Sequence, residues 1–219
     1  MKGNLMKKIL VIFLSFIFVT FQAAKAEIGI GISGALHMLD GSGTETTRQS
    51  GQRNKGSHSE DVGVAEAFIE FIDESGYTVG ISYIPTRDVG DKSRSDTNTE
   101  GDTGTYRANA ELDDLIQLYA DIPMTQAYGL DIYGKVGLQH ATVVTEEDLN
   151  SGETYPNKDV YGFTIGLGAK GDLPYGGLYY KSELTYTDFG QYKAQGTAGN
   201  IVNADIESIA ARLSVGYKF

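Results

Sequence analysis

The sequence contains no cysteine, no tryptophan and only four prolines, and it has fewer basic than acidic residues. Without cysteine the protein can form neither a disulfide framework nor a thiolate metal site. Its 18 basic and 29 acidic residues give a net charge of −11, which argues against nucleic-acid binding by phosphate neutralisation. The longest apolar run, residues 9–21, is shorter than the roughly 20 residues of a membrane-spanning helix. A helical membrane protein is therefore excluded as well.

The apolar run lies in an N-terminal segment with the features of a secretory signal peptide. Three lysines precede the run, and Ala24 and Ala26 follow it as the small residues of an A-x-A cleavage site. We predict that residues 1–26 are cleaved and that residues 27–219 form one domain. The signal contains four basic residues and no acidic one, so the net charge of the mature domain is −15.

Downstream of the signal peptide, apolar and polar residues alternate in repeated segments. In the C-terminal segment Leu213, Val215, Tyr217 and Phe219 share one face, and polar or small residues share the other. A period of two is typical of a β-strand. In the fourth segment Asp114 interrupts the apolar face, which predicts a bulge or the rim of a sheet. We predict eight strands, in the ranges 28–38, 62–72, 77–83, 108–122, 130–138, 161–169, 178–186 and 209–219.

The connections between these segments alternate in length. Three are expected to be tight turns, at residues 73–76, 123–128 and 174–177. Four are expected to be long polar loops, at residues 40–61, 87–105, 145–158 and 191–203. Strict alternation places all tight turns at one end and all long loops at the other. This arrangement predicts an all-β fold, an eight-stranded antiparallel up-and-down barrel without free sheet edges.

The alternation alone leaves open which face of the barrel is outside. A soluble lipocalin-like barrel would enclose a ligand with its apolar face, whereas an outer-membrane barrel presents that face to lipid. Charged residues spread along the opposite face and aromatic residues at the strand ends favour a transmembrane β-barrel with a charged lumen. The predicted lumen charges are Glu66, Glu70, Glu111, Lys135, Lys181, Glu183 and Arg212.

Counted from the strand ends, the inward-facing charges fall at two heights. An eight-stranded lumen is just wide enough for side chains to fill it, and opposite charges in that space should pair. We therefore predict a plugged barrel. The upper layer comprises Glu66, Lys135, Glu183 and Arg212, and the lower layer comprises Glu70, Asp121, Asp131, Lys170 and Lys181.

The signal peptide, the eight strands and the ending Leu-Ser-Val-Gly-Tyr-Lys-Phe resemble the small bacterial outer-membrane barrels, the class of outer-membrane protein A, outer-membrane protein X and the opacity proteins. The resemblance implies that Leu213, Val215, Tyr217 and Phe219 form the signal that the outer-membrane assembly machinery recognises. It also implies a monomer in the outer membrane, in contact with its lipids and lipopolysaccharide.

The same resemblance implies a function at the cell surface. Long polar loops outside the cell would serve a structural or adhesion-like role, with host or phage surfaces as candidate partners. A narrow channel for ions or small solutes is the principal alternative, and it requires the lumen charges to leave a wet path. A soluble secreted binder stays open as an alternative at the level of the fold.

A lipid A-modifying enzyme is the second functional alternative, because some barrels of this size use a serine, a histidine and an acid on lipid A. Here only His140, with Thr142 two residues later, presents an imidazole and a hydroxyl on the outward face. Threonine replaces serine, and the flanking motif is missing. We therefore predict a non-enzymatic protein without catalytic residues.

Residues 96–102 resemble the first half of a calcium loop, with oxygen-bearing side chains at alternate positions. The twelfth position of that loop, where a bidentate glutamate would stand, is Arg107. The segment is better explained as a solvated acidic loop. We expect no metal and no cofactor.

Overall fold

The computed structural model describes residues 26–97, 103–148 and 153–219, almost all of them in strands. The predicted signal peptide lies outside this part apart from Ala26, as does most of the calcium-like segment. No helix in the described ranges is long and apolar enough to cross a membrane. The described residues form nine strands: β1 (Glu27–Thr46), β2 (Arg53–Ile72), β3 (Thr78–Ile84), β4 (Arg87–Thr97), β5 (Thr103–Ala127), β6 (Leu130–Asp148), β7 (Lys158–Asp172), β8 (Leu178–Gln195) and β9 (Ile201–Lys218).

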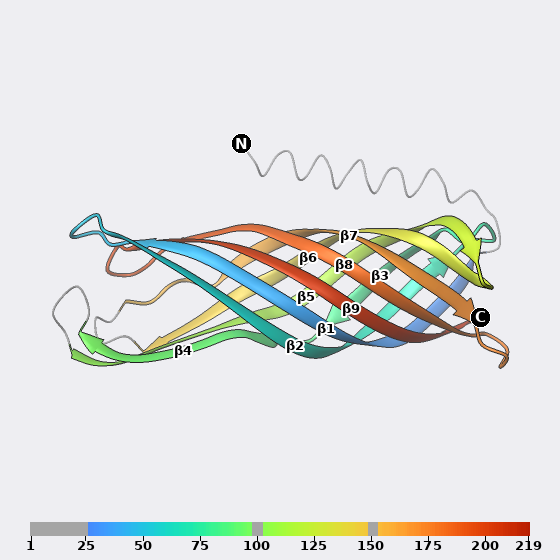
Figure 1. Cartoon of the computed structure of the whole chain (residues 1–219), viewed down its shortest axis with the longest axis horizontal. Coiled ribbons are helices and arrows are strands. Elements are labelled where there is room, and N and C mark those ends of the chain that lie inside the picture. The colour runs from blue at the N-terminus through green and yellow to red at the C-terminus, as the bar shows by residue number, and fades with distance from the viewer. Residues whose placement is uncertain (1–25, 98–102, 149–152) are drawn as a thin grey trace.

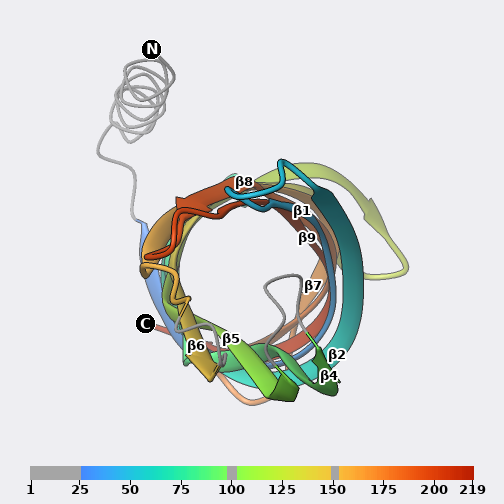
Figure 2. The same ribbon diagram turned by 90° about the vertical axis from the view of Figure 1, so that its left-hand side faces the viewer.

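The strands form one closed antiparallel ring, seen end-on in Figure 2. Neighbours in the ring follow the order of the chain, and β1 pairs with β9 to close it. β3 and β4 both pair with β5, one after the other, and are separated only by Pro85 and Thr86. They are therefore two segments of one strand, interrupted where proline lacks an N–H for the ladder. The ring has eight strands in cross-section, which confirms the predicted eight-stranded up-and-down barrel.

One end of the barrel, on the right in Figure 1, carries the tight turns and the C-terminus, and we call it the lower end. Above this end, side chains alternate between an apolar outer face and a polar interior. Ile32 is 69% exposed, and the next residue, Ser33, is buried. Leu213 is 71% exposed, and the residue before it, Arg212, is buried. This apolar band ends at a ring of acidic residues: Asp40, Asp61, Asp113, Asp159, Asp188 and Glu207.

The long polar connections are mostly strand, and their prediction as loops is wrong. The β1–β2 ladder continues to Thr46 opposite Arg53, and the β8–β9 ladder continues to Gln195 opposite Ile201. Beyond the apolar band these segments are rich in polar and small residues, so the alternation that marks a strand in lipid is lost although the backbone ladder persists. We call the barrel above the acidic ring the crown; it forms the left part of Figure 1.

Three bulges lie at the base of the crown, one each in β4, β5 and β8; the β4 bulge is between Asp88 and Gly90. In β5 the register shifts between Asp113 and Ile116, and Asp114 has a φ of 49°, which confirms the bulge predicted there. In β8 the register shifts between Asp188 and Gln191. Each bulge inserts one extra residue, and a slip of one residue reverses the face of every side chain beyond it.

Apolar side chains turn into the interior at and above these bulges. Leu112 and Leu115 of β5 are fully buried, and Phe189 and Tyr192 of β8 pack with them. The crown thus has an apolar interior and a polar surface, the reverse of the band below. We call this packed group the crown cluster: Ile84, Leu112, Leu115, Ala141, Val143, Val160, Phe189, Tyr192 and Ala194.

Candidate functional site

Below the crown, a continuous chain of ion pairs fills the barrel interior. Lys181 Nζ lies 2.9 Å from Glu70 Oε2 and 2.8 Å from Asp121 Oδ2. Lys135 Nζ lies 2.8 Å from Asp121 Oδ1 and 3.1 Å from Glu183 Oε1, so it joins the two predicted layers. We call this group the ion cluster: Glu66, Glu70, Asp121, Lys135, Lys181, Glu183 and Arg212.

Arg212 forms the upper end of the ion cluster and uses all three guanidinium nitrogens. Its Nε and Nη2 donate to the two oxygens of Glu66 at 2.7 and 3.0 Å, and its Nη1 donates to Glu183 Oε2 at 2.9 Å. His37 Nε2 lies 3.3 Å from Glu66 Oε1, and its Nδ1 lies 3.2 Å from Ser208 Oγ. A forked, charge-assisted arrangement of this kind fixes geometry as well as energy.

Three tyrosine hydroxyls, from β5, β6 and β8, donate to carboxylates of the ion cluster. Tyr119 and Tyr179 donate to Glu70 at 2.6 and 2.8 Å, and Tyr133 donates to Glu183 at 2.7 Å. These bonds satisfy carboxylate lone pairs that the lysines leave open, as a buried charge requires. The carboxylates are thereby held in place from several strands at once.

The pattern of charged residues alone does not identify these tyrosines, although the sequence contains a signal for them. Each stands on the inward phase of its strand, opposite glycine on a neighbouring strand. A Cβ added at Gly168 would collide with the Tyr133 ring, and one at Gly80 would collide with Tyr119. The paired glycines give these large rings room inside a narrow barrel.

The ion cluster leaves almost no free space. The cavity between its side chains measures about 10 Å³, which is room for about one water. Every member of the cluster is less than 9% exposed. In the described part of the chain, the interior is therefore filled by the ion cluster below and by the crown cluster above.

Glu111 is the predicted lumen residue that the structure places elsewhere. It lies above the β5 bulge, opposite Val144 in the ladder, and accepts a hydrogen bond from Asn109 Nδ2 on the same outer face. The prediction that Glu111 faces the lumen is wrong. The prediction assumed an unbroken alternation along the strand, but the extra residue at Asp114 reverses the face of Glu111.

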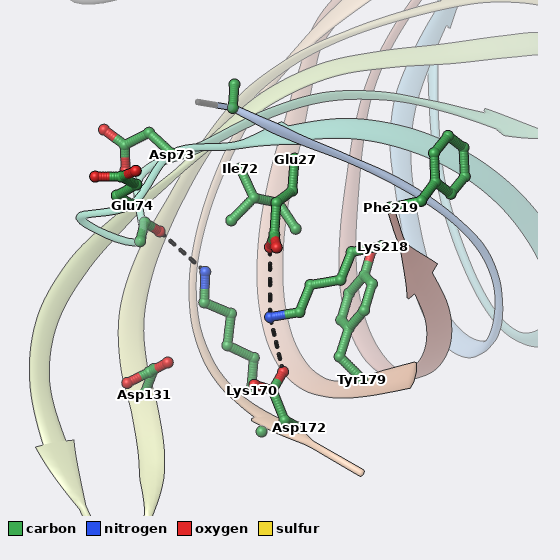
Figure 3. Close-up of a pocket in the computed structure, with 13 residues that line it drawn as sticks. Glu27, Ile72, Asp73, Glu74, Asp131, Lys170, Asp172, Tyr179, Lys218 and Phe219 are labelled. Carbon is green, nitrogen blue, oxygen red and sulfur yellow. Dashed lines mark hydrogen bonds and ion pairs between the residues drawn. The ribbon is translucent and has the colours of Figure 1, made fainter. Parts of the chain in front are cut away.

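Asp131 and Lys170, expected in the lower layer, lie at the lower mouth of the barrel (Figure 3). Lys170 Nζ donates to the Gly76 carbonyl oxygen at 2.9 Å, at the tight turn after β2. Lys218 Nζ lies 3.0 Å from a carboxylate oxygen of Asp172 across the same mouth. These residues line a cavity of about 620 Å³ that stays below the ion cluster.

The C-terminal strand presents its alternate residues to the outside. Leu213, Val215, Tyr217 and Phe219 are between 45% and 71% exposed on the apolar band. The Phe219 backbone exchanges two hydrogen bonds with Ile28, at 3.1 and 3.2 Å, and so completes the closing ladder between β9 and β1. The role of these side chains as an insertion signal stays a prediction.

His140 and Thr142 face outward, as expected, but they do not form a nucleophile and base pair. The Thr142 hydroxyl donates to Asp159 Oδ1 at 3.1 Å, and His140 Nε2 lies 3.6 Å from the same oxygen. Both side chains therefore converge on a carboxylate instead of on each other. An acyl-transfer mechanism needs the hydroxyl within reach of the imidazole.

No protein-family model and no curated protein sequence matches the chain. Among solved structures, outer membrane protein OprG from Pseudomonas aeruginosa aligns with a TM-score of 0.59 and 19% identity, over 89% of this chain and 96% of that one. Outer membrane protein AlkL, solved in lipid bilayers, aligns with a TM-score of 0.51 and 11% identity, over 91% and 93% of the two chains. These likenesses concern the fold. Together with the apolar outer band they define the fold class: the protein has the fold of the small eight-stranded β-barrels of the bacterial outer membrane.

Proposed function

We propose that the protein is a closed, non-enzymatic barrel that displays its crown at the cell surface for structural or adhesion-like interactions. The observation that carries this proposal is the filling of the interior at two levels. The ion cluster leaves about 10 Å³, and above it Ile84, Leu112 and Leu115 of the crown cluster are fully buried. A barrel filled in this way offers solutes no wide path, so its function is assigned to its outer surface.

Hydrogen bonds between the hairpin tips support a rigid crown. The Arg48 N–H donates to Asn200 Oδ1 at 3.0 Å, and the Tyr155 hydroxyl donates to Glu45 Oε1 at 3.0 Å. Burial and the nearby Glu45 carboxylate raise the pKa of Tyr155, so this hydroxyl keeps its proton at neutral pH. Three hairpins are thus joined before any partner arrives. Such preorganisation reduces the entropy lost on binding.

The outer surface of the barrel below the crown is suited to contact with membrane lipid. The apolar band would contact outer-membrane lipids and the acyl chains of lipopolysaccharide, with the barrel as a monomer. Its aromatic residues near the two edges, among them Tyr161, Tyr186 and Tyr217, are 36% to 51% exposed and suit an interfacial position. Host or phage surfaces are the partners that we propose for the crown.

Recording of ion currents across planar bilayers tests whether the barrel is closed. We expect no porin-level conductance from the purified protein. A double variant, Lys135→Ala with Glu183→Ala, removes two opposite charges from the ion cluster and keeps the net charge, so it should conduct measurably more. Porin-level currents from the unmodified protein would instead support the channel alternative.

Trimming one hairpin tests the role of the crown. Gly43 and Gly56 lie opposite each other in the β1–β2 ladder, so residues 44–55 can be replaced by a two-residue Asn-Gly turn that suits a hairpin. Heat-modifiable gel mobility would verify that the barrel still forms. We expect weaker attachment of cells that express the variant to host-cell layers, or a loss of phage sensitivity. Unchanged behaviour in both assays would contradict a role for this hairpin.

A further inference from the structure

Arg87, the first residue of β4, is a buried cation without a partner. Its side chain is 4% exposed, and within the described residues Nε, Nη1 and Nη2 all lack a hydrogen-bond partner. The cations of the ion cluster differ, because Lys135, Lys181 and Arg212 each lie within 2.8 Å of a carboxylate oxygen. An unpaired buried guanidinium is costly and therefore calls for a specific explanation.

The interior carboxylate whose charge acts on Arg87 is already paired with another guanidinium. Glu66 acts on the Arg87 guanidinium through its charge, but both of its oxygens accept hydrogen bonds from Arg212. One of them also contacts His37. Neither oxygen accepts a hydrogen bond from Arg87. All three guanidinium nitrogens of Arg87 can therefore donate hydrogen bonds to a bound ligand.

A gap in the crown wall connects Arg87 to the outside. The β2–β3 ladder ends at Ala67 opposite Tyr83, and β4 pairs with β5 alone among the described strands. The upper part of β2 and the edge of β4 therefore face each other without a ladder, and the two strands diverge toward the crown in Figure 1. A cavity of about 510 Å³ occupies this gap, and Arg87 forms part of its lining.

The other walls of the cavity restrict the charge and polarity of a ligand. Val62 and Val64 line it, and Val64 also packs against the crown cluster, so one wall is apolar. The carboxylates of the lining, which are exposed or half-buried, would repel an anion with several charges more than one with a single charge. The acidic residues of the lining are Glu60, Asp61, Asp88 and Glu111.

We propose that Arg87 is a binding site for a small organic monocarboxylate that enters through the gap between β2 and β4. The planar fork of the guanidinium matches the two oxygens of a carboxylate, which would satisfy the buried donors. A short apolar tail would lie along Val62 and Val64. Acetate and butyrate are the simplest probes, and inorganic phosphate is the probe for a more highly charged oxyanion.

Side-chain NMR of the isotope-labelled protein in detergent micelles tests the site directly. We expect butyrate, titrated against sodium chloride of equal ionic strength, to shift the Arg87 Nε–H signal with saturation in the millimolar range. Butyrate should bind more tightly than acetate, and phosphate more weakly than either. Arg87→Lys keeps the charge but loses the fork, and it should weaken binding about tenfold, or ~1.4 kcal/mol. Arg87→Gln should abolish binding. Because both variants lack the Arg87 signal, binding to them is followed through the backbone amide signals of Val62 and Val64, which line the same cavity.

The matched control is Arg53→Gln, which removes the same charge from an exposed position of the crown. It should leave butyrate binding unchanged. In the absence of ligand, Arg87→Gln should also unfold at the same or a higher urea concentration than the parent, because it removes an unpaired buried charge. The proposal is overturned if butyrate leaves the Arg87 signal in place, if Arg87→Gln binds as well as the parent, or if chloride alone produces the same shift.

Discussion

The apolar band and the crown are built on the same ring of strands, yet the band has an apolar exterior and a polar interior and the crown has the reverse. In the band, Ile32 and Leu213 face outward and the ion cluster fills the interior. In the crown, polar residues face outward and the crown cluster fills the interior. The surrounding medium explains the difference, because lipid favours an apolar exterior and water favours burial of apolar groups. One barrel thus contains two cores with different sources of stability.

The bulges allow one strand to serve both regions. Ile116 and Leu112 of β5 are four residues apart, which would put them on one face of a regular strand, but Ile116 is 43% exposed and Leu112 is fully buried. In β8, Tyr186 faces outward, whereas Tyr192, six residues later, is 4% exposed. The extra residue between the members of each pair reverses the face. In β5 and β8 the bulge thus brings apolar residues inside, whereas in β6 Val143 shares the inward phase of Lys135 without a bulge.

The largest change in the free energy of unfolding is expected from a substitution in the ion cluster, inside the apolar band. Glu183→Gln removes the carboxylate that pairs with Arg212 Nη1 and one of the two that pair with Lys135. Loss of one partner from a buried ion pair typically costs 3–5 kcal/mol, so we expect about 4 kcal/mol. Urea unfolding of the protein in lipid vesicles would measure this change. Asp205→Asn, at an exposed position of the crown, is the control and should cost less than about 0.5 kcal/mol. Similar losses for both variants would contradict the ion cluster as the core of the band.

A smaller effect is expected in the crown, where two adjacent valines offer a matched pair. Val143 faces the crown cluster and is 4% exposed, whereas Val144 faces outward. Val143→Ala should cost about 2 kcal/mol through lost burial and a residual cavity, and Val144→Ala should cost less than about 1 kcal/mol. Hydrogen exchange would locate the loss in the crown amides. Equal losses would show that the crown interior is not a packed core.

The sequence predicts the band well and the crown poorly, for a physical reason. In lipid every strand must alternate, so the ring, the position of the bulge at Asp114 and the inward direction of Arg212 follow from a period of two. In water the backbone ladder of a strand tolerates polar residues on one face and small residues on the other. The sequences of the crown strands therefore resemble those of loops. Arg87 fell in such a segment, and its burial depends on the irregular step at Pro85.

The smallest expected effect concerns the bulge that separates the two regions. Asp114 adopts a left-handed φ of 49°, which glycine tolerates without strain, whereas glycine also gains more entropy in the unfolded chain. Asp114→Gly should therefore change the free energy of unfolding by less than about 1 kcal/mol, and Asp114→Val should lower it by about 1–2 kcal/mol.

Both variants keep the extra residue, so Leu112 should stay inside and the crown amides should stay protected from exchange in Asp114→Gly. Deletion of Asp114 is the informative contrast, because it would turn Leu112 outward and drive Glu111 into the crown cluster. If Asp114→Gly lost crown protection as fully as the deletion, the carboxylate itself would hold the bulge. If only the deletion did so, the count of residues alone would set which β5 side chains face the crown interior.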